Sequence, residues 1–148
     1  MTSKLSIVIM AAGRGTRMNS DLPKVLHKLS GDTMLNHVIS TSISLSPKKI
    51  IVVVGHEAQM VKDSISNKNI LFSIQKEQNG TGHAVMQTSE HLKNFDGNTL
   101  VLSGDVPLIK KSTLISLIDR QESNGYDASM LTAQIDNPKG YGLSLIHI

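Results

Sequence analysis

The chain has 148 residues, which suits one domain of ordinary size or a piece of a larger one, and it has no cysteine for a disulfide framework or a thiolate metal site. Its net charge of +3 comes mostly from scattered basic residues and its aromatic content is 3%, so a nucleic-acid partner is not expected. No long apolar stretch precedes the first glycines, which predicts a soluble, cytoplasmic protein with no signal peptide or membrane span.

The first predicted element is a buried strand over Leu5–Ile9, and a loop rich in small residues follows it. Alanine and glycine allow the backbone N–H groups of such a loop to approach a phosphate closely. Arg14, Arg17 and Lys24 add full positive charge, so the loop is predicted to bind a polyanion. Its other candidate binding residues are Met10, Ala11, Ala12, Gly13, Gly15 and Thr16.

Two common phosphate-loop patterns fail here, because Met18 stands where both the P-loop and the Rossmann spacing from Gly13 require glycine. The stretch Ala-Ala-Gly-x-Gly-Thr-Arg-Met followed by Pro-Lys instead resembles the signature of the sugar-phosphate nucleotidyltransferases. The alternative interpretation is a glycine-rich turn with solvated cations.

The next elements alternate between helix and strand. Thr33 is expected to cap a helix that ends before Pro47, and Ile50–Val54 is predicted to be a central strand buried on both faces. After Gly55, a short helix and a weaker strand, Ile70–Ile74, follow. The apolar residues on one face of that short helix are Ala58, Val61 and Ile65.

A second glycine-bearing loop follows the strand that ends at Ile74. Gln75 and Gln78 carry amides that both donate and accept hydrogen bonds, which matches the imide edge of a pyrimidine, and the backbone at Gly80 and Thr81 could read the remaining carbonyl. The alternative is a polar turn before a capped helix, which is predicted to run to Leu92. Gln-x-x-Gln-x-Gly-Thr-Gly-His-Ala resembles the uracil-reading segment of the bacterial N-acetylglucosamine-1-phosphate uridylyltransferases.

His83 lies inside this second motif, either orienting the glycine loop or simply starting the helix. The six histidines have no zinc-type spacing, so no chemistry is assigned to them.

A third candidate segment follows the predicted strand Thr99–Ser103. Asp105 can bind a hard cation through oxygen or can serve as a turn residue. Gly-Asp-x-Pro-Leu resembles the family segment whose aspartate holds the catalytic magnesium, so the candidates here are Ser103, Gly104 and Asp105. Further along, Ser112 is expected to cap a helix that Gly125 ends, and residues 128–135 to be extended.

This alternation predicts an α/β fold, a Rossmann-like, doubly wound and mostly parallel sheet. Ligands of such sheets bind outside the carboxyl ends of the strands where the strand order reverses, so the three glycine-bearing loops should converge there.

The resemblance implies a reaction in which N-acetylglucosamine 1-phosphate attacks the α-phosphorus of UTP, giving UDP-N-acetylglucosamine, a cell-wall precursor, and pyrophosphate. In it, Arg17 would meet the departing phosphates, Lys24 would hold phosphate oxygens and Asp105 would hold Mg²⁺. The segment Asn137–Gly142 resembles a loop lining the sugar site, with Gly142 as a candidate contact. Complete relatives also acetylate glucosamine 1-phosphate and are expected to be homo-oligomers through a C-terminal domain.

The resemblance spans Ser6 to Gly142, so residues 1–142 are predicted to be the N-terminal portion of a nucleotidyltransferase domain, and residues 143–148 depart from the pattern. We therefore expect a partial sequence that is inactive and aggregation-prone alone. Two alternatives remain open: a related nucleotidyltransferase for another phosphorylated acceptor, of methylerythritol, guanylyl or hexose type, and a nucleotide-binding fragment without catalysis.

Overall fold

A computed structural model of the chain describes residues 4–13, 20–134 and 136. The chain divides into two compact units, Met1–Leu114 and Ile115–Ile148. Within the described ranges, every helix is too short or too polar to cross a bilayer.

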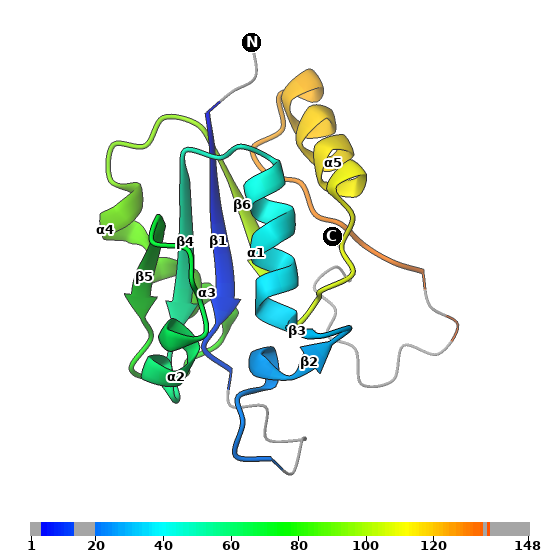
Figure 1. The fold of residues 1–148 in the computed structure, drawn as a ribbon. Helices are drawn as coiled ribbons and strands as arrows, with labels where there is room; N and C mark the ends of the chain where they lie inside the picture. Colours follow the sequence, from blue (N-terminus) through cyan, green and yellow to red (C-terminus); the bar gives the residue numbers. More distant parts are fainter. Residues whose placement is uncertain (1–3, 14–19, 135, 137–148) are drawn as a thin grey trace. The chain divides into compact units, whose positions relative to one another are not determined.

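The first unit is built on a four-stranded sheet (Figure 1). Its strands are β1 (Leu5–Ala11), β4 (Lys49–Val54), β5 (Ile70–Ile74) and β6 (Asn98–Ser103). They lie in the order β5-β4-β1-β6, and each neighbouring pair is parallel. The chain moves outward from β1 to β5 and then returns to the other side of β1, so the strand order reverses between β1 and β6. This confirms the predicted α/β fold with a parallel sheet.

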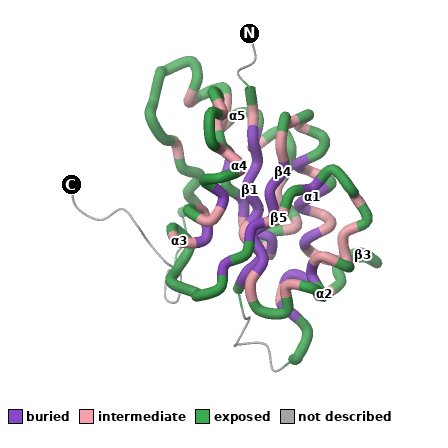
Figure 2. Tube along the Cα trace, turned by 90° about the vertical axis from the view of Figure 1, so that its left-hand side faces the viewer, coloured by how far each residue is buried: buried purple, intermediate pink, exposed green. Residues whose placement is uncertain are grey.

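The core surrounds the two central strands, most of whose hydrophobic residues are buried (Figure 2). Continuous apolar runs suit strands that are covered on both faces. One face packs Val8, Ile51 and Val53 against Ala84 of α3 (Thr81–Met86). Helix α1 (Met34–Ser44) lies in front of the sheet in Figure 1, with α3 behind it. Its buried residues are Leu35, Val38, Ile39 and Ser42.

Helix α1 begins as predicted, because Thr33 Oγ1 accepts a hydrogen bond of 3.1 Å from the backbone N–H of Asn36. A small hairpin that the sequence analysis missed precedes it, formed by β2 (Lys28–Leu29) and β3 (Asp32–Thr33). Its two turn residues, Ser30 and Gly31, have φ angles of 50° and 93°, as a type I′ turn requires.

Two helix predictions between β4 and β6 need correction. Helix α2 (Ala58–Asp63) ends before Ile65, although Val61 is fully buried as expected. The single helix expected up to Leu92 is two helices, α3 and α4 (Ser89–Leu92). The break occurs at Thr88, whose N–H and hydroxyl both donate to the Val85 carbonyl while its side chain is fully buried. This tight closure ends α3.

The last helix is α5 (Lys111–Asn124). The prediction that Ser112 caps it is wrong, because Ser112 lies inside the helix and the hydrogen bond from Leu114 N reaches Lys110 O. Gly125 ends it as predicted, with a φ of 63° and Schellman bonds from Gly125 N to Glu122 O and from Tyr126 N to Gln121 O. The extended segment expected at 128–135 is not a strand over 128–134, which pairs with no described strand, and residue 135 lies outside the described residues.

Candidate functional site

Lys24 reaches the carboxyl edge of the sheet from a short 3₁₀ helix, η1 (Lys24–Leu26). Pro23 precedes it and accepts a hydrogen bond of 2.9 Å from Leu26 N. Val25 and Leu26 are buried, with 5% and 6% of their surface exposed. These two side chains anchor the turn, so Lys24 projects from a fixed backbone position.

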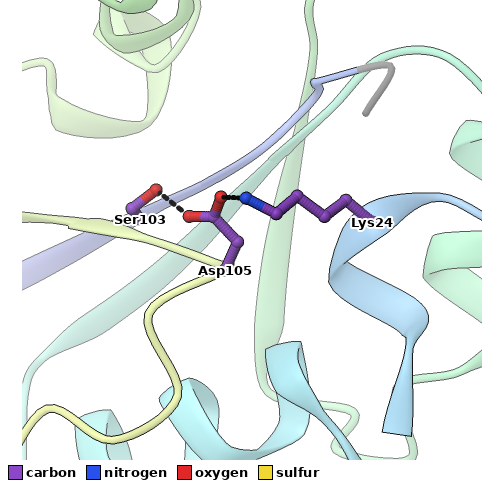
Figure 3. Close-up of polar contacts among 3 residues, drawn as sticks. All are labelled: Lys24, Ser103 and Asp105. Carbon is purple, nitrogen blue, oxygen red and sulfur yellow. Dashed lines mark hydrogen bonds and ion pairs between the residues drawn. The ribbon is translucent and has the colours of Figure 1, made fainter. Parts of the chain in front are cut away.

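Asp105 follows β6 and faces Lys24 across 81 residues of sequence. Asp105 Oδ2 lies 2.6 Å from Lys24 Nζ, and Ser103 Oγ donates to Asp105 Oδ1 over 2.6 Å (Figure 3). Gly104 allows the end of β6 to lie close to β1 and to the 3₁₀ helix, because a Cβ at this position would lie 3.0 Å from the Met10 carbonyl oxygen and 3.2 Å from Val25 Cγ1. The side chains of Lys24 and Asp105 remain 43% and 27% exposed, so a ligand can reach both.

The surroundings of Asp105 keep it ionised. Burial raises the pKa of its carboxyl, but hydrogen bonds from Lys24 and Ser103 and the charge of Lys24 outweigh this, so the pKa lies below its ordinary value of 3.8. At neutral pH Asp105 is therefore a carboxylate, and its ion pair with Lys24 forms a polar centre that can bind phosphate through one member and a cation through the other.

The ends of β1, β4 and β5 meet beside this centre. A Cβ at Gly55 would lie 3.0 Å from both Cβ and O of Ala12 and 3.1 Å from the carbonyl oxygen of Gln75. Gln78 Nε2 donates to the Ala12 carbonyl over 2.8 Å, which joins the second glycine loop to the first. Together with the Lys24–Asp105 pair, these contacts confirm that the three predicted loops converge.

Gln75 is 4% exposed, and its amide is held inside the second loop. Its Nε2 lies 3.1 Å from the Gly80 carbonyl oxygen and 3.1 Å from His83 Nδ1. On the other side of the His83 ring, Nε2 lies 3.1 Å from Gln87 Nε2, which also donates to the His83 carbonyl oxygen over 3.2 Å. The sequence leaves the role of His83 open, and Gln87 was not among the candidate residues. The four-residue spacing of the two on one helix was the available signal.

The structure thus brings several candidate residues to one edge of the sheet. They are Met10, Ala11, Ala12, Lys24, Gln75, Gln78, Gly80, Thr81, Ser103, Gly104 and Asp105, with Gly13 following Ala12 directly. Other candidates lie outside the described residues. They are Arg14, Gly15, Thr16, Arg17, the loop 137–142 with Gly142, and the tail 143–148.

The fit of a metal ion can be tested on the donors present. The described residues contain no group of three or more histidine, aspartate or glutamate side chains that could hold a metal. Asp105 is a single carboxylate with a partly exposed side chain, which suits Mg²⁺, because this ion is usually bound by one or two carboxylates together with substrate phosphates and water. These donors fit a metal ion that is also coordinated by the phosphates of a bound nucleotide, and they do not fit a metal ion coordinated by protein side chains alone.

A family model for the MobA-like NTP transferase domain matches residues 7–144, which include all three loops. The chain belongs to this family. The family assignment confirms the coarser prediction of a nucleotidyltransferase domain, and the MobA-like match covers nearly the whole chain.

Curated relatives agree with the resemblance stated from the motifs. This MobA-like domain is 47% identical over 139 residues to the bifunctional protein GlmU of Prochlorococcus marinus (strain NATL2A), covering 93% of the chain and 31% of the relative. It is 50% identical over 135 residues to GlmU of Streptococcus agalactiae serotype V, covering 91% and 29%. The chain therefore spans about 30% of the length of these relatives.

Solved structures share the fold at low identity. Rv0371c from Mycobacterium tuberculosis H37Rv superposes with a TM-score of 0.72 at 18% identity, over 83% of this chain and 63% of that one. A second structure of that protein, in complex with manganese, gives 0.68 at 18% identity over 81% and 60%. A divalent cation is thus present in a solved structure with this fold.

Proposed function

We propose that this chain carries the nucleotide-binding half of a uridylyltransferase that makes UDP-N-acetylglucosamine. In the reaction, a phosphate oxygen of N-acetylglucosamine 1-phosphate bonds to the α-phosphorus of UTP. The bond from that phosphorus to the oxygen bridging to the β-phosphate breaks, and pyrophosphate leaves. Such a transfer needs no protein nucleophile, because positioning and charge neutralisation do most of the catalytic work.

The observation that carries this proposal is the Lys24–Asp105 pair at the reversal point of the sheet. Lys24 Nζ and Asp105 Oδ2 are 2.6 Å apart, and Asp105 follows β6, which lies beside β1. A phosphate bound along the loop after β1 would lie next to both charges. This is the edge where open α/β sheets bind nucleotides.

Each residue has a proposed role. Lys24 binds phosphate oxygens of UTP, and Asp105 would hold a magnesium ion, which when bound neutralises phosphate charge. Gln75 and Gln78 contact the uracil, helped by the backbone at Gly80 and Thr81. The hydrogen bond from Gln78 to the Ala12 carbonyl supports this, because it keeps the base loop against the phosphate loop.

Part of the proposal rests on sequence alone. Arg17 is proposed to meet the departing phosphates and Gly142 to line the sugar site, and both lie outside the described residues. The relatives extend well beyond the length of this chain, so further sugar contacts are expected from a segment that the chain does not contain.

The test uses two proteins. One is the 148-residue chain, titrated with UTP, CTP and GTP in the presence of Mg²⁺ by calorimetry and assayed for pyrophosphate release with N-acetylglucosamine 1-phosphate. The other is a chimera in which residues 1–142 replace the matched segment of the Streptococcus agalactiae relative. We expect weak, magnesium-dependent UTP binding without turnover from the chain, and UDP-N-acetylglucosamine formation by the chimera.

The intact relative, assayed in parallel, is the control for the chimera. A chimera that prefers CTP, or that uses a polyol phosphate or another hexose phosphate as acceptor, would replace the proposal with a related transferase. Nucleotide binding with no turnover in the chimera, beside an active relative, would identify a binding module.

A further inference from the structure

The amide of Gln75 has both of its hydrogens engaged inside the protein. One acceptor is the Gly80 carbonyl oxygen and the other is His83 Nδ1, each 3.1 Å from Gln75 Nε2. Among the described residues, no hydrogen bond involves Gln75 Oε1. The contacts therefore fix which end of the amide is turned inward and leave the oxygen as the end that can accept from a ligand.

His83 lies between the side-chain amides of Gln75 and Gln87. A neutral imidazole accepts at one ring nitrogen and donates at the other. Amide nitrogens face both ring nitrogens, because Gln87 Nε2 lies 3.1 Å from His83 Nε2 just as Gln75 Nε2 lies 3.1 Å from Nδ1, and a neutral ring can accept from only one of them. Gln75 is 4% exposed and is also held by Gly80, whereas Gln87 is less buried and can turn its amide, so Nδ1 accepts from Gln75 and the proton lies on Nε2. In this tautomer the Gln87 amide turns its oxygen toward the His83 Nε2–H.

Rotating the Gln75 amide by half a turn would break both hydrogen bonds and bring Oε1 to about 3.1 Å from the Gly80 carbonyl oxygen. Two acceptors at that distance repel each other. His83 contributes the second of the two restraints, and a side chain without an acceptor at the Nδ1 position would remove it.

We propose that His83 is a positioning residue that locks the Gln75 amide with its oxygen available, and so selects uracil over cytosine. The selectivity part rests on the proposed function, in which Gln75 reads the base. Uracil presents an N–H donor at N3, which Oε1 can accept, whereas cytosine has a bare acceptor nitrogen there. A freely rotating amide could serve either base, and a locked one favours uracil.

The first test does not depend on nucleotide binding. Long-range ¹⁵N correlation spectra of the free 148-residue chain at mildly alkaline pH report which nitrogen of each histidine carries hydrogen. Comparison with His83→Asn identifies the His83 signals. We expect a protonated Nε2 and a bare Nδ1, and a proton on Nδ1 would overturn the proposal.

The second test measures the ratio of UTP to CTP affinity in variants of the same chain. His83→Phe keeps a ring but cannot accept, and we expect the ratio to fall roughly tenfold, the worth of about one hydrogen bond. His83→Asn places an amide oxygen near the Nδ1 position and should keep most of the ratio. Met86→Ala, an exposed position on the same helix, is the matched control.

An unchanged ratio in His83→Phe, or an equal loss in His83→Asn and His83→Phe, would refute the positioning role. Equal affinity of the unaltered chain for UTP and CTP would instead defeat the uridylyl assignment. In that case the tautomer measurement would still decide whether His83 holds Gln75, so the two failures are distinguishable.

Discussion

Gly55 allows the ends of three strands to approach one another, and its replacement by alanine should be costly. The added Cβ would lie 3.0 Å from two atoms of Ala12 and 3.1 Å from the Gln75 carbonyl oxygen, where ordinary carbon contacts begin at about 3.5 Å. Two of these three atoms are backbone oxygens. Gln75 cannot easily retreat, because its N–H donates to the Val54 carbonyl over 2.8 Å.

Overpacking of this kind costs about 1–3 kcal/mol. At about 2–4 °C per kcal/mol for a chain of this length, Gly55→Ala should lower the melting temperature by about 2–12 °C. Circular dichroism of the 148-residue chain measures it. Gly82→Ala is the control, because Gly82 lies in α3 with open space around its Cβ position and should gain up to about 1 kcal/mol. A Gly55→Ala protein as stable as the unaltered chain would show that the strand ends are not packed as described.

Three further outcomes are expected. Lys24→Met should change the unfolding free energy by less than about 1 kcal/mol, since the ion pair is partly exposed, yet weaken UTP binding tenfold or more in calorimetry. The control, Lys28→Met, should leave both the unfolding free energy and the UTP affinity unchanged. The lowered pKa of Asp105 adds stability above its ordinary value of 3.8 that is lost as pH falls through the lower folded value. Urea midpoints of the unaltered chain and Asp105→Asn should therefore converge below that pH, and a constant gap would contradict this. Gln78→Ala removes the bond to the Ala12 carbonyl and should reduce UTP affinity several-fold, about 0.5–1.5 kcal/mol, while unaltered affinity would count against coupling of the loops.

The parallel sheet could be predicted from the sequence because its strands are strong local signals. β-branched runs such as Ile50–Val54 end at glycines, and each of the four strands of the parallel sheet lies within two residues of its expected bounds. The convergence of the loops followed from topology alone, because parallel strands place their carboxyl ends at one edge. The rule predicts that the segment after β1 and the loop after β6 lie near each other, and the Lys24–Asp105 contact joins them although the two residues are distant in sequence.

Other features depend on contacts that no local pattern encodes. The helix expected up to Leu92 divides at Thr88, where complete burial and a hydroxyl bond to the Val85 carbonyl override helical spacing. The strands on either side of Ser30 and Gly31 have two residues each, too few to show alternation. The sequence also placed Gln75 in the site without revealing that its amide nitrogen is already taken by Gly80 and His83.

The pairing of Lys24 with Asp105 has a consequence for the ionic strength dependence of ligand binding. If a phosphate binds Lys24 as proposed, its oxygen replaces the carboxylate oxygen of Asp105 as the partner of the lysine, so the number of ion pairs is nearly conserved. Added salt weakens an isolated lysine–phosphate contact, but it also weakens the competing pair that must open first. The two effects partly cancel, so the contribution of Lys24 to affinity is the difference between its attraction to the phosphate and its attraction to Asp105. Because the charge of Lys24 is already paired in the free protein, its contact with a phosphate should depend only weakly on salt concentration.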